Sequence, residues 1–423
     1  MSGSLPSAET IARAELPNGI VILAYENPQN PSVVISGYLW AGSLSEAREQ
    51  AGLASFSAGM LMRGTETRSF GQINEALESV GAQLGFHAGG HTTGFGGKAL
   101  VEDLDLLLGI LSESLTQPTF AQTEVEKLRG QILTALQRRA FNTRSMARLT
   151  FDALLFPDHP YGQSTLGYEE TVSALTRADL VSHYRERYSP QGMVIAVVGA
   201  IPAAAAIDRV ERALGQWQAP QATPDRRVPP RLTLPGPRRE FVPIEGKTQS
   251  DVVLGWPGLA RKDPDYMKAR VANTILGVFG IMGRLGDSVR DKQGLAYYVY
   301  SQLEAGLGAG PWLSVAGVDP ANVERAIEGI LQEVRRLRDE PVPADELADS
   351  QSFMTGSMPL RLETNEGISS TLLTIEQYDL GFDYLLRFAD LVNAVTVQDI
   401  RNVAQAYLDP DVYALAIAGP EGS

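Results

Sequence analysis

Apolar residues recur along this chain with the periods of both β-strands and α-helices. Residues 19–25 and 33–40 form alternating or continuous apolar runs, which are typical of strands. Apolar residues three and four positions apart predict helices at 53–62, 70–80, 101–115, 123–139 and 145–155. Strands that precede a series of helices favour an α+β fold, in which helices cover one face of a mostly antiparallel sheet.

The second half of the chain repeats this outline. Strand and helix patterns recur at 251–256, 266–277, 296–303, 312–318 and 322–338. The two halves also end alike, because Thr176 and Thr396 each precede an Asp by three residues and lead through a helical pattern to an apolar run that ends at a glycine. A threonine N-cap with a carboxylate three residues later marks the start of a helix. A repeat of about two hundred residues indicates two homologous domains rather than a solenoid.

A proline-rich stretch separates the two halves. Repeated prolines between 215 and 240 remove backbone donors and fix φ, so neither a helix nor an inner strand can persist there. We therefore expect an N-terminal tail at 1–14, a first α+β domain at 15–215, a linker at 216–240 and a second α+β domain at 241–423.

Composition excludes several classes of function. The 423 residues carry a formal net charge of -14 without a run of Lys or Arg, so nucleic acid is not an expected partner. The chain has no cysteine, which leaves only His and carboxylate side chains as metal ligands. No apolar stretch approaches the length of a membrane span. A cytoplasmic location is expected from this sequence, or a periplasmic one if a signal peptide has been removed.

One short segment combines a helix end with an aromatic strand. Residues 282–292 are predicted to be helical, Gly294 stands where a left-handed residue ends a helix, and a strand follows from Leu295. Arg290 then lies in the last helical turn and Tyr297 near the start of the strand. On a regular strand Tyr297 shares one face with Val299 and Ser301. Two interpretations stay open at this point: Arg290 and Tyr297 face one cleft, or Arg290 offsets the helix dipole and Tyr297 is a half-buried strand residue.

The segment 280–302 (GIMGRLGDSVRDKQGLAYYVYSQ) resembles the second-half signature of the insulinase/pitrilysin (M16) peptidase family, in the branch that includes the mitochondrial processing peptidase and bacterial two-subunit peptidases. The resemblance extends over nearly the whole chain. It includes Leu-Pro-Asn-Gly at 16–19, Gly-Thr at 64–65, His-Pro-Tyr-Gly at 159–162, and the strand ends at Gly199 and Gly419. It implies two homologous α+β domains that form half of a metallopeptidase clamshell.

The zinc motif of the family is absent. Active members carry His-x-x-Glu-His on the first-domain helix, where two His on one helix face bind zinc and the Glu activates water. The matching positions here are Ser55, Ala58 and Gly59, and the position of the third ligand, a Glu on a later helix, matches Ala135. A hydroxyl, methyl groups and a hydrogen cannot hold zinc, so we expect no metal and no cofactor in this chain.

The four histidines offer only a weak alternative. His87 and His91 are four residues apart, and a two-histidine metal site at that spacing is conceivable on a helix or a strand. The sequence between them is Ala-Gly-Gly, which is poor helix, and no carboxylate is close by. His159 and His183 are expected to be packing or surface residues.

The resemblance therefore implies a role beside another chain. The expected partner is a homologous M16 subunit with an intact His-x-x-Glu-His motif, which carries the zinc and forms a heterodimeric metalloendopeptidase that is inactive without both chains. Arg290 and Tyr297 are expected to bind an extended peptide substrate and to stabilise the tetrahedral intermediate at the partner's zinc. The alternative is an inactive scaffold or peptide-binding subunit, as some family members without the zinc motif have become.

Overall fold

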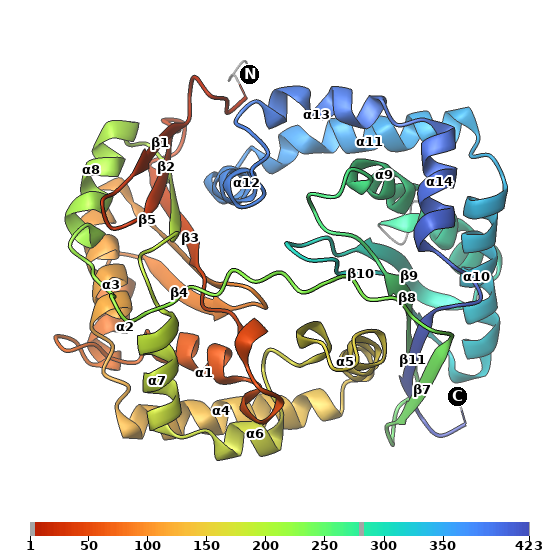
Figure 1. Ribbon diagram of the computed structural model, residues 1–423, viewed down its shortest axis with the longest axis horizontal. Helices are drawn as coiled ribbons and strands as arrows, with labels where there is room; N and C mark the ends of the chain where they lie inside the picture. Colours follow the sequence, from red (N-terminus) through yellow and green to blue (C-terminus); the bar gives the residue numbers. More distant parts are fainter. Residues whose placement is uncertain (1–4, 279–282, 423) are drawn as a thin grey trace. The chain divides into compact units, whose positions relative to one another are not determined.

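The computed structural model describes residues 5–278 and 283–422, which form two compact units (Figure 1). Each unit is assembled from three segments of the chain. Unit 1 comprises Met1–Leu136, Ser164–Arg227 and Met358–Arg387. Unit 2 comprises Gln137–Gln163, Val228–Ser357 and Phe388–Ser423. One of the three places where the chain passes from unit 1 to unit 2, between residues 227 and 228, lies inside the expected linker at 216–240.

Unit 1 is built on a six-stranded sheet with the order β1-β2-β6-β3-β5-β4. Its strands are β1 (Ala12–Glu15), β2 (Val21–Glu26), β3 (Ser32–Leu39), β4 (Gln83–Ala88), β5 (Thr93–Leu100) and β6 (Val194–Gly199). Neighbouring strands are antiparallel except β2 and β6, which run parallel with Val21 opposite Val194. The edge strands are β1 and β4, so each pairs with only one neighbour in the sheet.

Unit 2 repeats this topology without the first strand. Its five-stranded sheet has the order β7-β11-β8-β10-β9, and only β7 and β11 are parallel. The strands are β7 (Arg238–Pro243), β8 (Ser250–Pro257), β9 (Ala296–Leu303), β10 (Pro311–Val318) and β11 (Ala414–Gly419). The order matches β2-β6-β3-β5-β4 strand for strand. This match confirms the expected α+β fold and its internal repeat.

Helices cover both sheets. In unit 1 they are α1 (Leu53–Met60), α2 (Phe70–Glu78), α3 (Leu104–Thr116), α6 (Glu169–Ala174), α7 (Arg177–Arg187), α8 (Ala203–Leu214) and α12 (Asn365–Gln377), with most of α4 (Gln122–Ala140). In unit 2 they are α5 (Thr143–Leu155), α9 (Tyr266–Gly277), α10 (Val323–Asp339) and α14 (Val397–Tyr407), with most of α11 (Ala344–Arg361) and of α13 (Tyr384–Asn393). None of the described helices is long and apolar enough to cross a bilayer.

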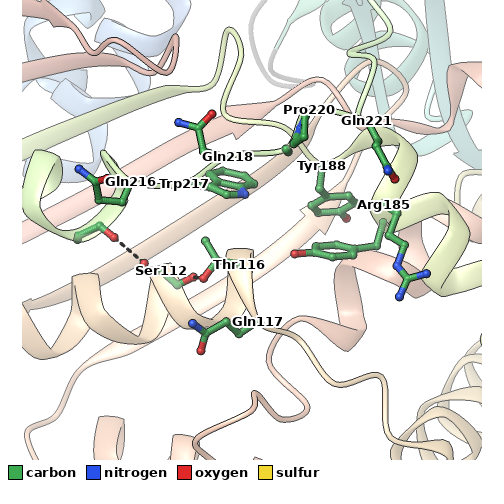
Figure 2. Close-up of a pocket in the computed structure, with 13 residues that line it drawn as sticks. Ser112, Thr116, Gln117, Arg185, Tyr188, Gln216, Trp217, Gln218, Pro220 and Gln221 are labelled. Carbon is green, nitrogen blue, oxygen red and sulfur yellow. Dashed lines mark hydrogen bonds between the residues drawn. The ribbon is translucent and has the colours of Figure 1, made fainter.

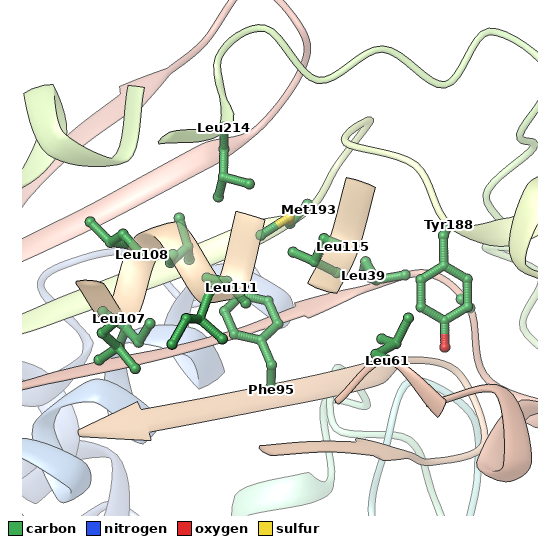
Figure 3. Close-up of a cluster of buried hydrophobic side chains, with 14 of the residues drawn as sticks. Leu39, Leu61, Phe95, Leu107, Leu108, Leu111, Leu115, Tyr188, Met193 and Leu214 are labelled. Atoms are coloured by element: carbon green, nitrogen blue, oxygen red, sulfur yellow. The ribbon is translucent and has the colours of Figure 1, made fainter. Parts of the chain in front are cut away.

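The main core of unit 1 lies on the face of the sheet that α3 covers. Leucines on the buried face of α3 pack against Phe95 of β5 and Met193, as Figure 3 shows. The opposite face of the sheet carries a second apolar cluster, in which Tyr38 and Val194 pack near Leu372 of α12. Both faces of this sheet are therefore partly covered, which explains why β6 is buried along its whole length.

Each unit contains a helix from the other half of the sequence. Helix α5 comes from the first half of the sequence but packs on β8 and β11 of unit 2. Helix α12 comes from the second half but packs on β3 and β6 of unit 1. The compact units therefore differ from the continuous domains 15–215 and 241–423 expected from the sequence. An amphipathic pattern shows that a helix buries one face, but it does not specify the sheet that covers this face.

The repeated helix starts are present in both units. The Thr176 hydroxyl accepts a hydrogen bond from the Asp179 backbone N–H, and the Asp179 carboxylate accepts one from the Thr176 N–H. Thr396 and Asp399 form the same capping box at the start of α14. The strand after each helix is fully buried and ends at a glycine. The sequence pattern of the two half-ends is confirmed.

Candidate functional site

Three of the residues that the sequence analysis matched to the zinc motif, Ser55, Ala58 and Gly59, lie on α1 of unit 1. The Ser55 hydroxyl donates a hydrogen bond to the Thr165 carbonyl oxygen over 2.6 Å, so it serves a local structural contact. The Ala58 methyl is buried. A Cβ added at Gly59 would come within 3.0 Å of Cδ2 of Leu128 on α4. A side chain at position 59 would therefore require Leu128 to shift.

Helix α4 is held against α1 by side chains other than metal ligands. Arg63 follows α1 and forms an ion pair with Glu124 of α4 over 3.3 Å. The guanidinium of Arg129 lies 5.3 Å from the ring centre of Phe56 on α1, a cation–π contact. Ala135 is exposed on α4. Within the described residues, no group of three or more His, Cys, Asp or Glu side chains is arranged to hold a metal ion.

A half-buried glutamate that the sequence analysis missed fixes the start of α1. The N-cap Gly52 has φ +99° and no side chain, so it cannot cap the helix. The Glu46 carboxylate takes this role and accepts hydrogen bonds from the backbone N–H groups of Gly52 (2.9 Å) and Ala54 (2.5 Å). Burial raises the pKa of Glu46 to about 7, although both hydrogen bonds favour its charged form. No local spacing rule in the sequence points to a cap from six residues upstream.

The four histidines have different surroundings. His87 on β4 lies against Gly94 of the neighbouring strand, where an added Cβ would collide with the imidazole ring. His91 is outside both strands, in the β4–β5 connection. His159 and His183 are both buried, and His159 Nδ1 accepts a hydrogen bond from the Tyr161 N–H over 3.1 Å. These positions agree with packing roles for His159 and His183.

Arg290 lies in unit 2 on the segment η5 (Gly286–Lys292), a π-helix. The expected helix began at Met282, which lies outside the described residues. Gly294 has φ +63° and donates its N–H to the Arg290 carbonyl oxygen, so the predicted left-handed helix end is confirmed. The Arg290 guanidinium is half-buried, with Nε 3.5 Å from the Asp291 carboxylate. Single π-helical turns are rare and recur at functional sites.

Tyr297 lies at an irregularity of the edge strand β9. Tyr298 pairs with Gly317 and Ala296 pairs with Val318, so Tyr297 is an extra residue with no partner on β10. Its side chain is 63% exposed, whereas Val299 is fully buried. The expectation that Tyr297 shares one face with Val299 and Ser301 was therefore wrong. A β-bulge inserts one residue, breaks the alternation and re-aims a side chain.

The rest of β9 is held by α5. Arg144 of α5 lies 5.1 Å from the ring centre of Tyr298 and 5.5 Å from that of Tyr300, and it donates a hydrogen bond to the Tyr300 hydroxyl over 2.5 Å. The Tyr298 hydroxyl donates to the buried carboxylate of Asp251 on β8. Thr143 donates to the second oxygen of the same carboxylate over 2.5 Å. These contacts fix the strand immediately after the bulge, and the sequence alone did not identify them.

Unit 1 also has an open pocket of about 710 Å³ between α3, α7 and the segment after α8 (Figure 2). Glutamine side chains at 117, 216, 218 and 221 line it around Trp217. The Tyr184 hydroxyl donates to the Leu115 carbonyl oxygen over 2.8 Å. The lining also includes Arg185 and two tyrosines but no carboxylate or imidazole, the groups that most often act as general bases.

Sequence comparisons place the chain among zinc-peptidase relatives. The model described as insulinase (peptidase family M16) matches residues 21–168, and the model described as peptidase M16 inactive domain matches residues 174–354. An uncharacterized zinc protease from Streptomyces coelicolor is 28% identical over 419 residues, which are 97% of this chain and 90% of that protein. A similarly described protein from Bacillus subtilis is 26% identical over 413 residues, 98% of this chain and 99% of that protein.

Solved structures share the fold. A crystal structure described as peptidase M16 inactive domain from Pseudomonas fluorescens has a TM-score of 0.88 at 24% identity, over 97% of this chain and 98% of that chain. A protease from Helicobacter pylori has a TM-score of 0.91 at 17% identity, over 98% and 100% of the two chains. Since the two family models together span most of both units, this chain belongs to the M16 peptidase family.

Proposed function

We propose that this chain is the zinc-free subunit of a two-chain M16 metalloendopeptidase. In this proposal a homologous partner with an intact His-x-x-Glu-His motif binds the zinc, and this chain supplies Arg290 and Tyr297. One observation carries the proposal: the metal-binding side chains are replaced at all four positions on α1 and α4, whereas the phenol of Tyr297 is displayed on a strand bulge. A subunit without a catalytic role has no need of such a display.

The chemistry of peptide hydrolysis explains why these two residues are useful. Zinc on the partner would polarise the scissile carbonyl and activate a water molecule. Negative charge then develops on the former carbonyl oxygen. In our proposal the Tyr297 hydroxyl donates a hydrogen bond to this oxygen, and the Arg290 guanidinium adds a charge-assisted one. Donors that are fixed before the reaction stabilise the transition state more than the substrate.

The substrate in this proposal is an extended peptide that adds to a sheet edge. Strand β4 is suited to this role, because it pairs only with β5 and its side chains alternate between exposed and half-buried. It has no Pro and no Asp, Glu, Lys or Arg, the residues with which edge strands commonly resist pairing. Main-chain hydrogen bonds to β4 would give affinity without strict sequence preference.

Reconstitution with the homologous zinc subunit tests the proposal. We expect this chain alone to contain no stoichiometric zinc and to cleave no peptide, and the zinc subunit alone to be feeble. Mixing the two should raise peptidase activity, and a chelator should abolish it. If the zinc subunit alone reaches the rate of the mixture, this chain is a scaffold or peptide-binding subunit instead. Zinc near one atom per isolated chain would refute the assignment of the metal to the partner.

A further inference from the structure

A cavity of about 660 Å³ lies on the face of the unit 1 sheet that α12 partly covers. Its floor is formed by strands β1, β2, β6 and β3, and the residues at the C-terminal end of α12 close one side. Every lining residue belongs to unit 1. None of the lining residues belongs to α1, so this place is distinct from Ser55, Ala58 and Gly59.

Two arginines line the cavity, and they differ in their ion pairs. Arg13 of β1 forms a fork with Glu376 of α12, with Nη2 at 2.9 Å and Nε at 3.2 Å from the carboxylate, and it also lies 3.7 Å from Glu15. Arg226 has no carboxylate within ion-pair distance among the residues that the structure describes. Its only hydrogen bond there is a long one, 3.5 Å, to the Gln191 carbonyl oxygen. Arg226 is therefore a cation available to an anionic ligand.

The local structure holds Arg226 against the cavity. Its guanidinium lies 5.4 Å from the ring centre of Trp40, whose indole N–H donates to the Gly192 carbonyl oxygen over 3.0 Å. Gly192 has φ +71°, and a Cβ at this position would collide with the Arg226 guanidinium. A side chain at position 192 would thus displace Arg226 from Trp40. Stacking on an aromatic ring leaves the N–H groups at the edge of the guanidinium free to bind a carboxylate.

A second donor lies beside Arg226. Tyr38 lines the cavity and is only 6% exposed, yet its hydroxyl forms no hydrogen bond with any described residue. Burial is the main cause that raises the pKa of Tyr38, so the hydroxyl keeps its proton and remains a donor. Arg226 and Glu376 are the charged groups whose fields act on this hydroxyl. The Tyr38 hydroxyl oxygen is not itself fully enclosed, so a ligand or water in the cavity can accept its hydrogen bond.

We propose that this cavity binds a carboxylate of the peptide, with the Arg226 guanidinium and the Tyr38 hydroxyl as donors. The carboxylate belongs either to the C-terminus of the peptide or to an Asp or Glu side chain. The identity of the ligand as a peptide rests on the proposed function. Within the sheet, β5 separates β3 from the edge strand β4, so a peptide strand paired with β4 lies three strand spacings, roughly 14 Å, from the strand of Tyr38. About four extended residues span this distance, so one peptide can reach both places.

Binding of short peptides to this chain alone tests the proposal by calorimetry. The probes are one neutral peptide with a free C-terminus, the same peptide with a C-terminal amide, and the amidated peptide with a single Glu. At least one carboxylate-bearing probe should bind about tenfold or more tightly than the neutral amide, as a charge-assisted hydrogen bond allows. Preference for the free C-terminus identifies the chain end as the ligand, and preference for the Glu peptide identifies the side chain.

Three variants assign the effect to the cavity. Arg226→Gln should abolish the preference for the carboxylate, and Tyr38→Phe should weaken it several-fold. Arg212→Gln is the matched control, since Arg212 is an exposed arginine of unit 1 whose ion pair, with Asp208, lies within its own helix. Equal affinity for all three probes, or an unchanged preference in Arg226→Gln, would overturn the proposal. The assay needs neither zinc nor a partner, so its outcome is independent of the reconstitution experiment.

Discussion

Arg148 and Glu304 form a two-point ion pair, in which Nη1 donates to Oε1 and Nη2 to Oε2, each over 2.6 Å. The Nε of Arg148 also donates to the Asp152 carboxylate over 2.9 Å. Arg148 and Asp152 belong to α5, and Glu304 follows directly after β9. A helix from the first half of the sequence therefore holds the end of the edge strand that displays Tyr297 at its start.

Replacement of Arg148 should destabilise unit 2. Arg148→Met keeps much of the packing volume but leaves Asp152 and Glu304 without their cation. Because the pair is partly solvent-exposed, we expect the free energy of unfolding to fall by about 1–3 kcal/mol, less than for a fully buried pair. Urea denaturation measures this loss. Burial raises the pKa of Asp152 to about 6 even with Arg148 present, so the loss should be larger at pH 8 than at pH 5, where protonation removes the repulsion.

An exposed ion pair provides the control for this measurement. Arg335 and Glu328 form a surface pair on α10, with side chains 40% and 66% exposed. Arg335→Met should change the free energy of unfolding by no more than about 0.5 kcal/mol at either pH. An Arg148→Met loss of the same small size would show that the α5 contact does not hold β9.

The packing at Gly59 should resist restoration of a histidine. Gly59→His places an imidazole where Leu128 now packs, so we expect a loss of about 1–3 kcal/mol in the free energy of unfolding from overpacking. Chemical denaturation of a double-mutant cycle tests this cause. In a Leu128→Ala background the additional loss from Gly59→His should be much smaller, since the collision is removed. Equal losses in both backgrounds would show that Leu128 is not the obstacle.

Local signals in the sequence predicted the repeated elements correctly. The capping boxes at Thr176 and Thr396 and the left-handed Gly294 depend on residues within four positions of one another, so the sequence contains the whole cause. The residues that the resemblance matches to the zinc ligands, Ser55, Ala58, Gly59 and Ala135, could be named for a similar reason, because side-chain identity is read directly from the sequence.

Features that depend on distant partners were not predictable. The exchange of α5 and α12 between the units depends on which sheet covers each helix, and amphipathic spacing carries no information on that choice. The bulge at Tyr297 arises from the register between β9 and β10, so period-two reasoning on β9 alone placed its side chain on the same face as Val299 and Ser301. Glu46, Arg144 and Asp251 were missed because their partners are distant or belong to the backbone.

The buried His183 should make the chain less stable in acid. Burial is the main cause that lowers the pKa of His183 to about 4 in the folded chain, against an unfolded value near 6.5. Below pH 6.5 the unfolded chain binds a proton that the folded chain does not, so the free energy of unfolding falls as the pH falls from 6.5 toward 4. The expected loss is about 3 kcal/mol at most. Urea denaturation across this pH range measures it.

A variant isolates this contribution from other titrating groups. Glu46 and Asp152 have raised pKa values, so they act in the opposite direction and stabilise the folded chain as the pH falls. The useful quantity is therefore the difference between the wild-type chain and His183→Phe at each pH. This difference should shift in favour of the variant on acidification. A difference that is constant from pH 7 to pH 4 would contradict the prediction.

Tyr297→Phe and Arg290→Lys test the catalytic proposal directly on the reconstituted pair. The Tyr297 side chain is 63% exposed, so loss of its hydroxyl should leave the free energy of unfolding unchanged within about 0.5 kcal/mol. If the hydroxyl donates to the developing oxyanion, Tyr297→Phe should lower kcat about a hundredfold with little change in KM. Arg290→Lys keeps the charge but loses the planar fork, and it should also lower kcat.

Tyr300→Phe is the matched control for the hydroxyl, since Tyr300 lies on the same strand and donates no group to the proposed site. It loses the hydrogen bond from Arg144, so its melting temperature should fall slightly while kcat stays near normal. If Arg290 only offsets the helix dipole and Tyr297 only packs on its strand, the variants of these two residues should instead have lower melting temperatures and normal kcat. A normal kcat in Tyr297→Phe would remove the main support for a catalytic role, because the substitution deletes only the donor on which that role depends.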